Sequence, residues 1–249
     1  MSGFLVRAGI LAFAHRGDHL SGPENTMAAF EGAVALGYRY LETDIHCSRD
    51  GYLLAFHDES LDRVTDRTGR IAEMDYAEIQ KARVAGEHPI PSLEDLLTAF
   101  PDTFINIDMK ADATVAPFKA LIKRLRCQDR ICVGAFSHRR LQSLRADYPQ
   151  VCTSLSPKEV LWAKLRSFHF PTPKIRGACA QIPEQAGRLA LLDERMLETW
   201  RKLELPVHVW TINEPKDMNR LIDLGVDGIM TDDAAQLKSV LGNRELWQS

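Results

Sequence analysis

Two acidic residues in one apolar run have the types and the spacing that metal-assisted chemistry requires. Glu42 and Asp44 are two positions apart, so in a β-strand their side chains point to the same face, about 7 Å apart along the chain. Neighbouring carboxylates repel each other unless a cation or a proton lies between them. The pair therefore predicts a positively charged partner.

The residues that follow this pair predict a β-hairpin that returns a histidine to it. Asp50-Gly51 is a strong signal for a two-residue turn. Such a turn sets His57 opposite Asp44, whereas a longer loop shifts the register. Asp58 could then orient a histidine or cap the hairpin.

Short apolar runs alternate with helical patterns along the chain, which indicates parallel strands joined by crossover helices. The expected strands are residues 10–15, 40–46, 53–57, 104–109, 131–136, 151–155, 178–182, 207–212 and 228–231. The expected helices are residues 25–36, 76–85, 92–100, 113–125, 138–147, 157–165, 193–203 and 215–224.

The run 53–57 is one strand more than a closed eightfold barrel needs. Only a turn separates it from the preceding strand, so it cannot be a parallel neighbour of that strand. We predict an α/β fold, a (β/α)8 TIM-type barrel in one domain over residues 1–249. The hairpin and a short insertion, about residues 60–91, follow the second strand. A doubly wound open sheet is the alternative, but no glycine-rich phosphate loop follows any strand.

The C-terminal strand ends, where such barrels hold their catalytic groups, carry several charged residues. Besides the first acidic pair they are His15, Arg16, Asp108 and Lys110. Carboxylate ligands suit a hard cation such as Mg²⁺ or Ca²⁺, and flanking cations suit a phosphate. Two histidines can take a proton from an attacking oxygen and give one to a leaving alkoxide, each for about 10²- to 10⁴-fold in rate.

Five short motifs together resemble the glycerophosphodiester phosphodiesterase family. They are Ala14-His15-Arg16-Gly17, Pro23-Glu24-Asn25-Thr26, Leu41-Glu42-Thr43-Asp44, Phe56-His57-Asp58 and Val209-Trp210-Thr211-Ile212-Asn213. The resemblance runs from about residue 12 to residue 237. It implies a (β/α)8 barrel, a divalent metal, and hydrolysis of glycerophosphodiesters to glycerol 3-phosphate and an alcohol.

The resemblance also implies roles for individual residues. They are His15 and His57 as the acid/base pair, Glu42 and Asp44 as metal ligands, and Arg16 and Lys110 as phosphate contacts. The family's Glu-x-Lys motif is here Asp108-Met109-Lys110. Because aspartate is one methylene shorter, this third metal ligand either acts through water or draws the metal toward its strand.

The expected reaction begins when a histidine activates either water or the glycerol 2-hydroxyl of the substrate, the second route passing through a cyclic phosphate. Trp210 is expected to wall the substrate pocket and Gln181 to point into it. A lysophospholipase D that acts on lysolipids is the alternative, and it needs an apolar groove at the mouth. A non-catalytic phosphate-binding barrel is disfavoured because the histidines and acids are all present.

Composition sets limits on partners and location. The 31 basic and 34 acidic residues give a net charge of −3, which suggests neither a polyanionic partner such as nucleic acid nor a strongly cationic one. The small-molecule glycerophosphodiester substrate is what the resemblance implies. Five cysteines without a CxxC motif argue against a disulfide framework or a zinc knuckle. The apolar run 8–14 is too short for a signal peptide, and nothing approaches a membrane span of roughly 20 residues. We expect a cytoplasmic protein without stable membrane insertion, of unassigned oligomeric state.

Residues 162–170 place aromatic side chains among basic ones. Trp162, Phe168 and Phe170 alternate there with Lys164, Arg166 and His169. The segment could touch a membrane surface or a lipid chain. A helix and loop packed on the barrel is the preferred interpretation.

Overall fold

The computed structural model describes residues 3–5, 9–187 and 189–248. Ala8, the first residue of the apolar run 8–14, therefore lies outside the described residues, as do the two ends of the predicted domain. Within the described part, none of the helices combines the length and the hydropathy that crossing a bilayer requires.

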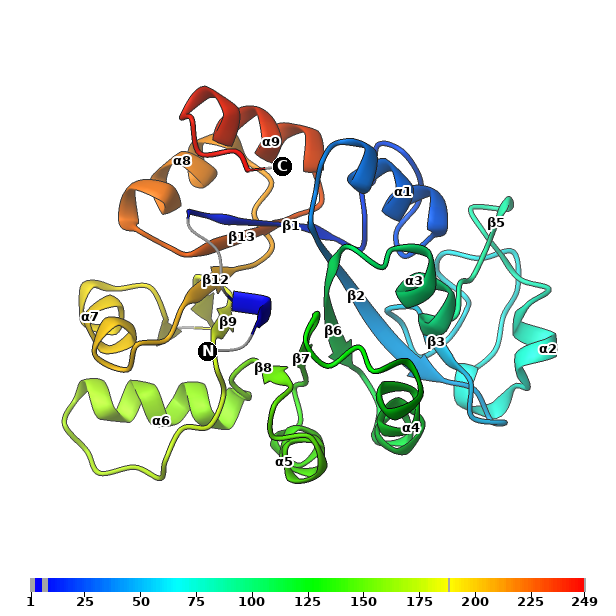
Figure 1. Cartoon of the computed structure of the whole chain (residues 1–249), viewed down its shortest axis with the longest axis horizontal. Coiled ribbons are helices and arrows are strands. Elements are labelled where there is room, and N and C mark those ends of the chain that lie inside the picture. The colour runs from blue at the N-terminus through cyan, green and yellow to red at the C-terminus, as the bar shows by residue number, and fades with distance from the viewer. Residues whose placement is uncertain (1–2, 6–8, 188, 249) are drawn as a thin grey trace.

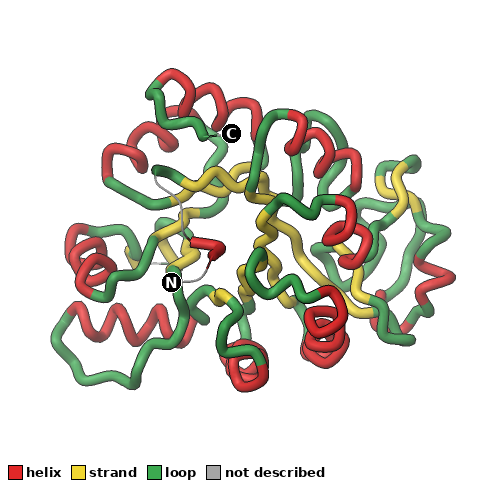
Figure 2. Tube along the Cα trace, viewed as in Figure 1, coloured by secondary structure: helices red, strands yellow, loops and turns green. Residues whose placement is uncertain are grey.

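Eight parallel strands form the centre of the molecule, in the order β8-β7-β6-β2-β1-β13-β12-β9. An isolated parallel bridge between Ser154 and Cys179 joins the two edge strands, so the sheet closes into a barrel. Figure 2 shows the strands at the centre and the helices outside them. The predicted (β/α)8 barrel is confirmed. Its strands are β1 (Leu11–His15), β2 (Tyr40–Cys47), β6 (Phe104–Met109), β7 (Ile131–Gly134), β8 (Cys152–Thr153), β9 (Ala180–Ile182), β12 (Val207–Val209) and β13 (Gly228–Thr231).

Helices surround the strands, and local sequence signals set their ends (Figure 1). Ser156 caps one helix and forms a capping box with Glu159. Another begins at Pro215 and ends at Gly225, whose φ of 82° suits glycine. The last helix was not predicted. The helices are α1 (Met27–Ala35), α3 (Leu93–Ala99), α4 (Val115–Leu125), α5 (His138–Asp147), α6 (Pro157–Ser167), α7 (Glu194–Lys202), α8 (Pro215–Leu224) and α9 (Ala234–Asn243).

The strand β3 (Leu53–Ala55) pairs antiparallel with β2, as the hairpin prediction required. The predicted register was wrong by one residue. Asp44 lies opposite Phe56, whose N–H donates to the Asp44 carbonyl at 3.0 Å. His57 is therefore one position beyond this pair.

A longer turn causes the shift of register. Ser48 N–H donates to the carbonyl of Tyr52 at 2.9 Å, so three residues form the loop instead of two. A two-residue type I′ turn needs positive φ at both central residues, and of the pair at the tip only Gly51 has it, at 92°. Asp50 instead accepts a hydrogen bond from the Ser48 hydroxyl at 2.6 Å.

The predicted insertion follows the hairpin and packs around apolar residues of its own. It holds the short elements η2 (Ile71–Glu73), α2 (Tyr76–Ile79), β4 (Arg83–Val84) and β5 (His88–Pro89). Its buried side chains join those of β3 in one cluster: Leu54, Phe56, Leu61, Ile71, Ile79, Ala82, Val84 and Ile90. This small core fixes the insertion beside the end of β2.

Aromatic rings and thiols fill the barrel interior beneath the charged end. Phe4, from the 3-10 turn η1 (Gly3–Leu5), packs edge-on against Tyr40 at 5.2 Å between ring centroids. Cys132, Cys152 and Cys179 bring their sulfurs within 4.8 Å of one another, and all five cysteines are free and buried. Burial raises the pKa of the Cys132 thiol well above its ordinary range, so it packs here as a neutral group.

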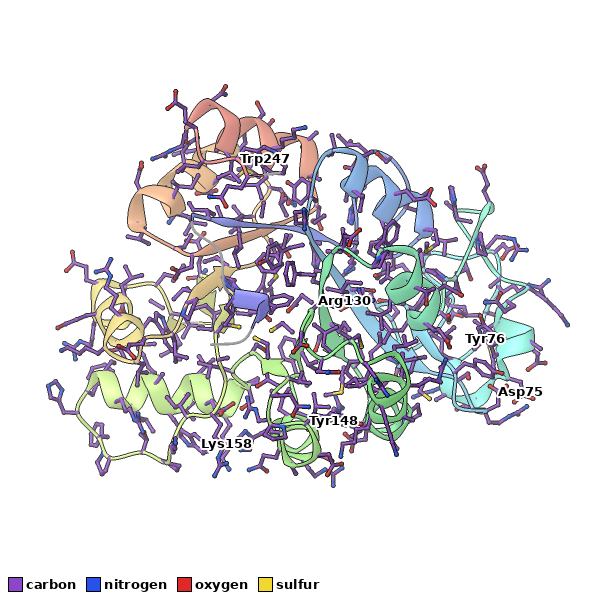
Figure 3. The ribbon with its side chains drawn as sticks, viewed as in Figure 1. Asp75, Tyr76, Arg130, Tyr148, Lys158 and Trp247 are labelled. Carbon is purple, nitrogen blue, oxygen red and sulfur yellow. The ribbon has the colours of Figure 1, made fainter. Side chains whose placement is uncertain are left out.

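The C-terminal segment packs on the outside of the barrel near β1. Trp247, labelled in Figure 3, packs edge-on against Tyr38 at 5.0 Å between ring centroids. The Tyr38 hydroxyl donates to the carbonyl of Ala234 at 2.7 Å, which holds the start of α9.

A buried histidine on β12 makes the fold sensitive to acid. The ring of His208 lies 5.0 Å from that of Phe13 between centroids and is fully buried. Burial lowers the pKa of His208 to about 3, whereas a histidine in the unfolded chain titrates near 6.5. The unfolded state therefore binds one proton more than the folded state between these two values.

We expect His208 to lower the free energy of unfolding as the pH falls from about 6.5 toward 3, by up to ~1.4 kcal/mol per pH unit. Denaturant titrations at a series of pH values, compared with those of His208→Leu, isolate this contribution. The variant should show the shallower pH dependence. Parallel curves for the two proteins would contradict the prediction.

Candidate active site

A cavity of about 370 Å³ opens at the C-terminal ends of the barrel strands. One part of its wall is ionisable and the other part is apolar. All of the residues that the sequence marked as candidate site residues line it: His15, Arg16, Glu42, Asp44, His57, Asp108, Lys110, Gln181 and Trp210. The structure thus brings together side chains from six separate parts of the sequence.

Strand register explains why these side chains meet. β1 pairs with β2 so that His15 lies beside Glu42, and β2 pairs with β6 so that Asp44 lies beside Asp108. Positions that are neighbours across parallel strands point to the same face. Arg16 follows β1 with a φ of 58°, and its N–H donates to the Glu42 carboxylate at 3.2 Å.

Two cationic side chains form ion pairs with Asp44 on β2 and Asp108 on β6. Lys110 Nζ lies 2.7 Å from an Asp44 oxygen and 2.8 Å from an Asp108 oxygen. Arg16 Nε lies 3.1 Å from Asp44. Burial alone would raise the pKa of Asp44, but the charges of Lys110 and Arg16 outweigh it and hold the pKa below its ordinary value. Asp44 is therefore ionised.

Glu42 has weaker compensation for its charge. The side chain is buried, and His15 Nε2 lies 3.7 Å from its carboxylate. Burial, and next the charge of Asp44, raise the pKa of Glu42 to about 7. The positive charges around Glu42 therefore compensate its carboxylate only in part, and a further cation beside it would favour its ionised form.

The donor set fits a hard divalent cation in its chemistry. Three carboxylates converge from two adjacent strands, and carboxylate oxygens are the ligands that Mg²⁺ and Ca²⁺ prefer. Among the described residues, only the thiols of Cys132, Cys152 and Cys179 bring three metal-ligating atoms within 4.8 Å of one another. The oxygens of the three carboxylates lie farther apart than that. Glu42, Asp44 and Asp108 are the residues that would hold such a metal.

Each of the two histidines is held by an aspartate on its Nδ1 atom. His15 Nδ1 lies 2.6 Å from Asp232, and Asn213 donates to the other Asp232 oxygen at 2.9 Å. His57 Nδ1 lies 2.6 Å from Asp58, so Asp58 orients the histidine. An aspartate that accepts from Nδ1 leaves Nε2 for proton exchange with a ligand.

The charges beside His15 change its proton affinity. Burial lowers the pKa of His15, but the charge of Glu42 and the hydrogen bond with Asp232 outweigh it and raise the pKa above 6.5. Burial alone would raise the pKa of Asp232. Its hydrogen bonds with His15 and Asn213 outweigh this effect and lower the pKa to about 2. Protonated His15 beside ionised Asp232 is a group that can give a proton away.

Arg63, from the insertion, connects the two sides of the site. It donates to Asp58 at 2.6 Å and to Glu24 at 2.7 and 2.9 Å. Glu24 in turn accepts from Arg16 at 3.0 Å. A continuous chain of ion pairs therefore runs from Arg16 to the aspartate that orients His57.

Sequence reasoning missed Asp232 and Arg63. A signal for Asp232 was present, since it directly follows the last barrel strand, at the same end where the other candidates were found. Arg63 had no such signal. It belongs to a polar insertion, and only the packing of that insertion brings it to Glu24 and Asp58.

The other part of the cavity wall is apolar. Phe136 and Trp210 meet edge-on at 6.2 Å between ring centroids, and Lys110 Nζ lies 6.0 Å from the Phe136 ring centre. From there the apolar wall extends over the loops after β8 and β9 and the hairpin of β10 (Gln185–Ala186) and β11 (Leu189–Ala190). Its members are Leu155, Pro157, Val160, Leu161, Ile182, Pro183, Ala186, Leu189 and Leu191.

Comparison with known proteins finds relatives over nearly the whole chain. Residues 15–236 match the model of the glycerophosphoryl diester phosphodiesterase family. A probable glycerophosphodiester phosphodiesterase 2 of Mycobacterium tuberculosis is 36% identical, over 98% of this chain and 95% of the relative. The human lysophospholipase D GDPD1 is 28% identical, over 92% of this chain and 85% of the relative.

Solved structures share the fold. A phosphodiesterase of Oleispira antarctica, in complex with its product sn-glycerol 3-phosphate, superposes with a TM-score of 0.80. It is 23% identical and the match covers 94% of this chain and 97% of that one.

Proposed function

This chain belongs to the glycerophosphoryl diester phosphodiesterase family and is a phosphoric diester hydrolase, and from that premise we propose its substrate and its catalytic groups. The substrate is a glycerophosphodiester, which the enzyme hydrolyses to glycerol 3-phosphate and an alcohol. His15 and His57 form the acid/base pair, and a divalent metal, Mg²⁺ or Ca²⁺, is bound by Glu42, Asp44 and Asp108.

One observation carries the proposal. Two histidines, each hydrogen-bonded through Nδ1 to an aspartate, line the same cavity as the cationic side chains of Arg16 and Lys110 and three carboxylates. Phosphodiester cleavage needs a proton acceptor, a proton donor and positive charge for the phosphate, and this set supplies each of them.

The roles of the residues follow from their contacts. Arg16 and Lys110 bind the phosphate oxygens and offset the charge that develops on them. His57, oriented by Asp58, accepts a proton through Nε2 from the attacking water or from the glycerol 2-hydroxyl. His15, whose pKa is raised, gives its Nε2 proton to the leaving alkoxide. Asp232 stabilises the charged form of His15 until the transfer.

A bound divalent metal supplies Lewis acidity to a phosphate oxygen. The three carboxylates fit it because they are oxygen donors on adjacent strands of one cavity, two of them buried. The raised pKa of Glu42 indicates that its charge is incompletely compensated. Lys110 lies between two of these carboxylates, Asp44 and Asp108, and would offer its ammonium group to a phosphate beside the metal site.

The apolar wall favours a second candidate function, the cleavage of lysolipids. Glycerophosphocholine has no group that would need this surface, whereas the acyl chain of a lysolipid would bury part of it. The polar groups at the other side of the cavity are the same for both substrates. Gln181 and Trp210 are proposed pocket residues for either.

We also propose a cytoplasmic location. Five free cysteines, all buried, are in accord with a reducing compartment.

Assays of phosphodiesters with purified protein test the proposal. We expect release of glycerol 3-phosphate from glycerophosphocholine with Mg²⁺ or Ca²⁺, and loss of release when a chelator is added. Lysophosphatidylcholine, assayed in parallel by choline release, measures the second candidate. Turnover of lysophosphatidylcholine alone would replace the first candidate with the second. Turnover of neither, with Mg²⁺, Ca²⁺ or Mn²⁺, would contradict both.

A further inference from the structure

The helix α6 carries an apolar stripe on the face that it turns to solvent. Leu161 and Leu165 are four residues apart, so they lie on one side of the helix, and Phe168 follows as its C-cap residue. Their exposed fractions are 50%, 38% and 49%. The opposite side of α6, with Ala163 and Ser167, is buried against the barrel. The sequence allows either packing on the barrel or contact with lipid. The buried side of α6 packs on the barrel, and its exposed side is free for the second contact.

The stripe is continuous with the wall of the active-site cavity. Leu161 belongs to both, and Leu189, across the mouth on β11, lines the cavity and is 36% exposed. Phe170, just beyond α6, is 59% exposed. In Figure 1, α6 runs outward from the end of β8 across the view, whereas α4 and α5 are seen end-on. Together these exposed side chains form a surface that we call the α6 patch: Leu161, Leu165, Phe168 and Phe170.

Basic residues surround the α6 patch although the whole chain is acidic. Residues 157–176 contain five Lys or Arg and one acid, Glu159, which is buried and paired with Arg145 at 3.0 Å. Lys174 and Arg176 are exposed. Lys158, labelled in Figure 3, lies 5.5 Å from the Trp162 ring centre.

The neighbouring helix α7 adds the cation Arg195, beside the exposed Glu194, while its other acid Glu198 is paired with Lys202 at 2.7 Å. The guanidinium carbon of Arg195 lies 4.5 Å from the centre of the Phe168 ring. The nearby carboxylate of Asp193 is paired with Lys164 at 2.8 Å. The rim of the α6 patch therefore presents positive charge beside exposed apolar side chains.

We propose that the α6 patch is a docking surface for an anionic lipid bilayer. An amphipathic helix that exposes apolar side chains between basic ones is the form that binds at a lipid surface, and basic side chains are attracted to anionic lipid. The continuity of the patch with the apolar wall means that a docked enzyme presents its cavity to lipid-borne phosphodiesters. In that use of the site the inference rests on the proposed function, and it favours the lysolipid candidate.

Co-sedimentation of the full-length protein with vesicles tests the proposal. We expect binding to vesicles of phosphatidylcholine with phosphatidylglycerol, weaker binding to phosphatidylcholine alone, and a decrease with added salt. The double variant Leu165→Ser with Phe168→Ser should bind at least about tenfold more weakly, because it removes apolar area from the contact. Neither residue lines the cavity, so its turnover of water-soluble glycerophosphocholine should equal that of the unmodified chain.

The matched control is Leu20→Ser, which removes a leucine that is 73% exposed on a loop after β1, a strand far from β8 and β9 in the sheet order. It should bind vesicles as the unmodified chain does. The proposal is overturned if the unmodified chain does not bind anionic vesicles, if the double variant binds equally well, or if Leu20→Ser weakens binding as much. It is also overturned if ultracentrifugation shows that the patch is a dimer interface, lost in the double variant. Vesicle binding without any phosphodiesterase activity would leave the docking surface standing and refute the proposed function.

Discussion

Replacing His15 or His57 by alanine should lower kcat by about 10²- to 10⁴-fold, the range in which a positioned acid or base contributes. Each histidine is the only group in its half of the proposed proton path. Each also has its Nδ1 atom engaged by an aspartate, so its loss removes a proton carrier that is already oriented. Steady-state release of glycerol 3-phosphate from glycerophosphocholine measures the effect.

Metal affinity is the control for this experiment. Neither histidine is a proposed metal ligand, so calorimetric titration with Mg²⁺ or Ca²⁺ should give nearly the same affinity as in the unmodified protein. The scheme with two histidines is wrong if both alanine variants keep the original turnover.

The aspartates behind the histidines allow a finer test. Asp232→Asn removes the charge that helps to raise the pKa of His15, so the pKa read from the pH profile of kcat should fall. The loss of turnover should be smaller than that of His15→Ala, because the histidine itself remains. A role of Asp232 in folding alone would leave the pH profile in place.

Glu42→Gln should have opposite effects on activity and on stability. It removes a proposed metal ligand, and turnover should fall by about 10²-fold or more, since a metal contributes several kcal/mol to such reactions. In the protein treated with chelator the same change should raise the free energy of unfolding at pH values above about 7. The reason is that the folded chain no longer holds a buried charge beside Asp44.

The pH dependence gives this prediction its sign. The pKa of Glu42 is near 4.5 in the unfolded chain and raised to about 7 in the fold. Between these values the folded state binds more protons, so this residue makes the metal-free protein less stable as the pH rises. The decline should be present in the original chain and absent from Glu42→Gln.

Denaturant titrations with chelator present measure the effect on stability, and release of glycerol 3-phosphate from glycerophosphocholine measures the effect on turnover. Calorimetric titrations measure the affinity for the metal. The conservative exchange Asp112→Asn serves as a control, because Asp112 is an exposed acid paired only with arginines outside the cavity. It should change neither metal affinity nor turnover. A Glu42→Gln protein that binds metal as before would remove Glu42 from the metal site.

The sequence by itself determined the architecture and the location of the candidate site. Alternating apolar runs and helical patterns indicate parallel strands, because a parallel pair needs a long crossover connection. The surplus run 53–57 was recognised as a hairpin arm because a turn is too short for that crossover. Once the strands are known, the rule that functional groups lie at their C-terminal ends selects residues such as His15 and Asp44 without any knowledge of contacts.

Only the tertiary structure decided which groups touch. A tight turn and a loop one residue longer are close in energy and in sequence signal, yet they differ in whether Asp44 faces Phe56 or His57. Arg63 reaches Asp58 because a separate small core positions the insertion. The exposed side of α6 likewise depends on which of its faces the barrel covers. Local patterns determine elements, whereas ion pairs and surfaces depend on packing between residues that are distant in the chain.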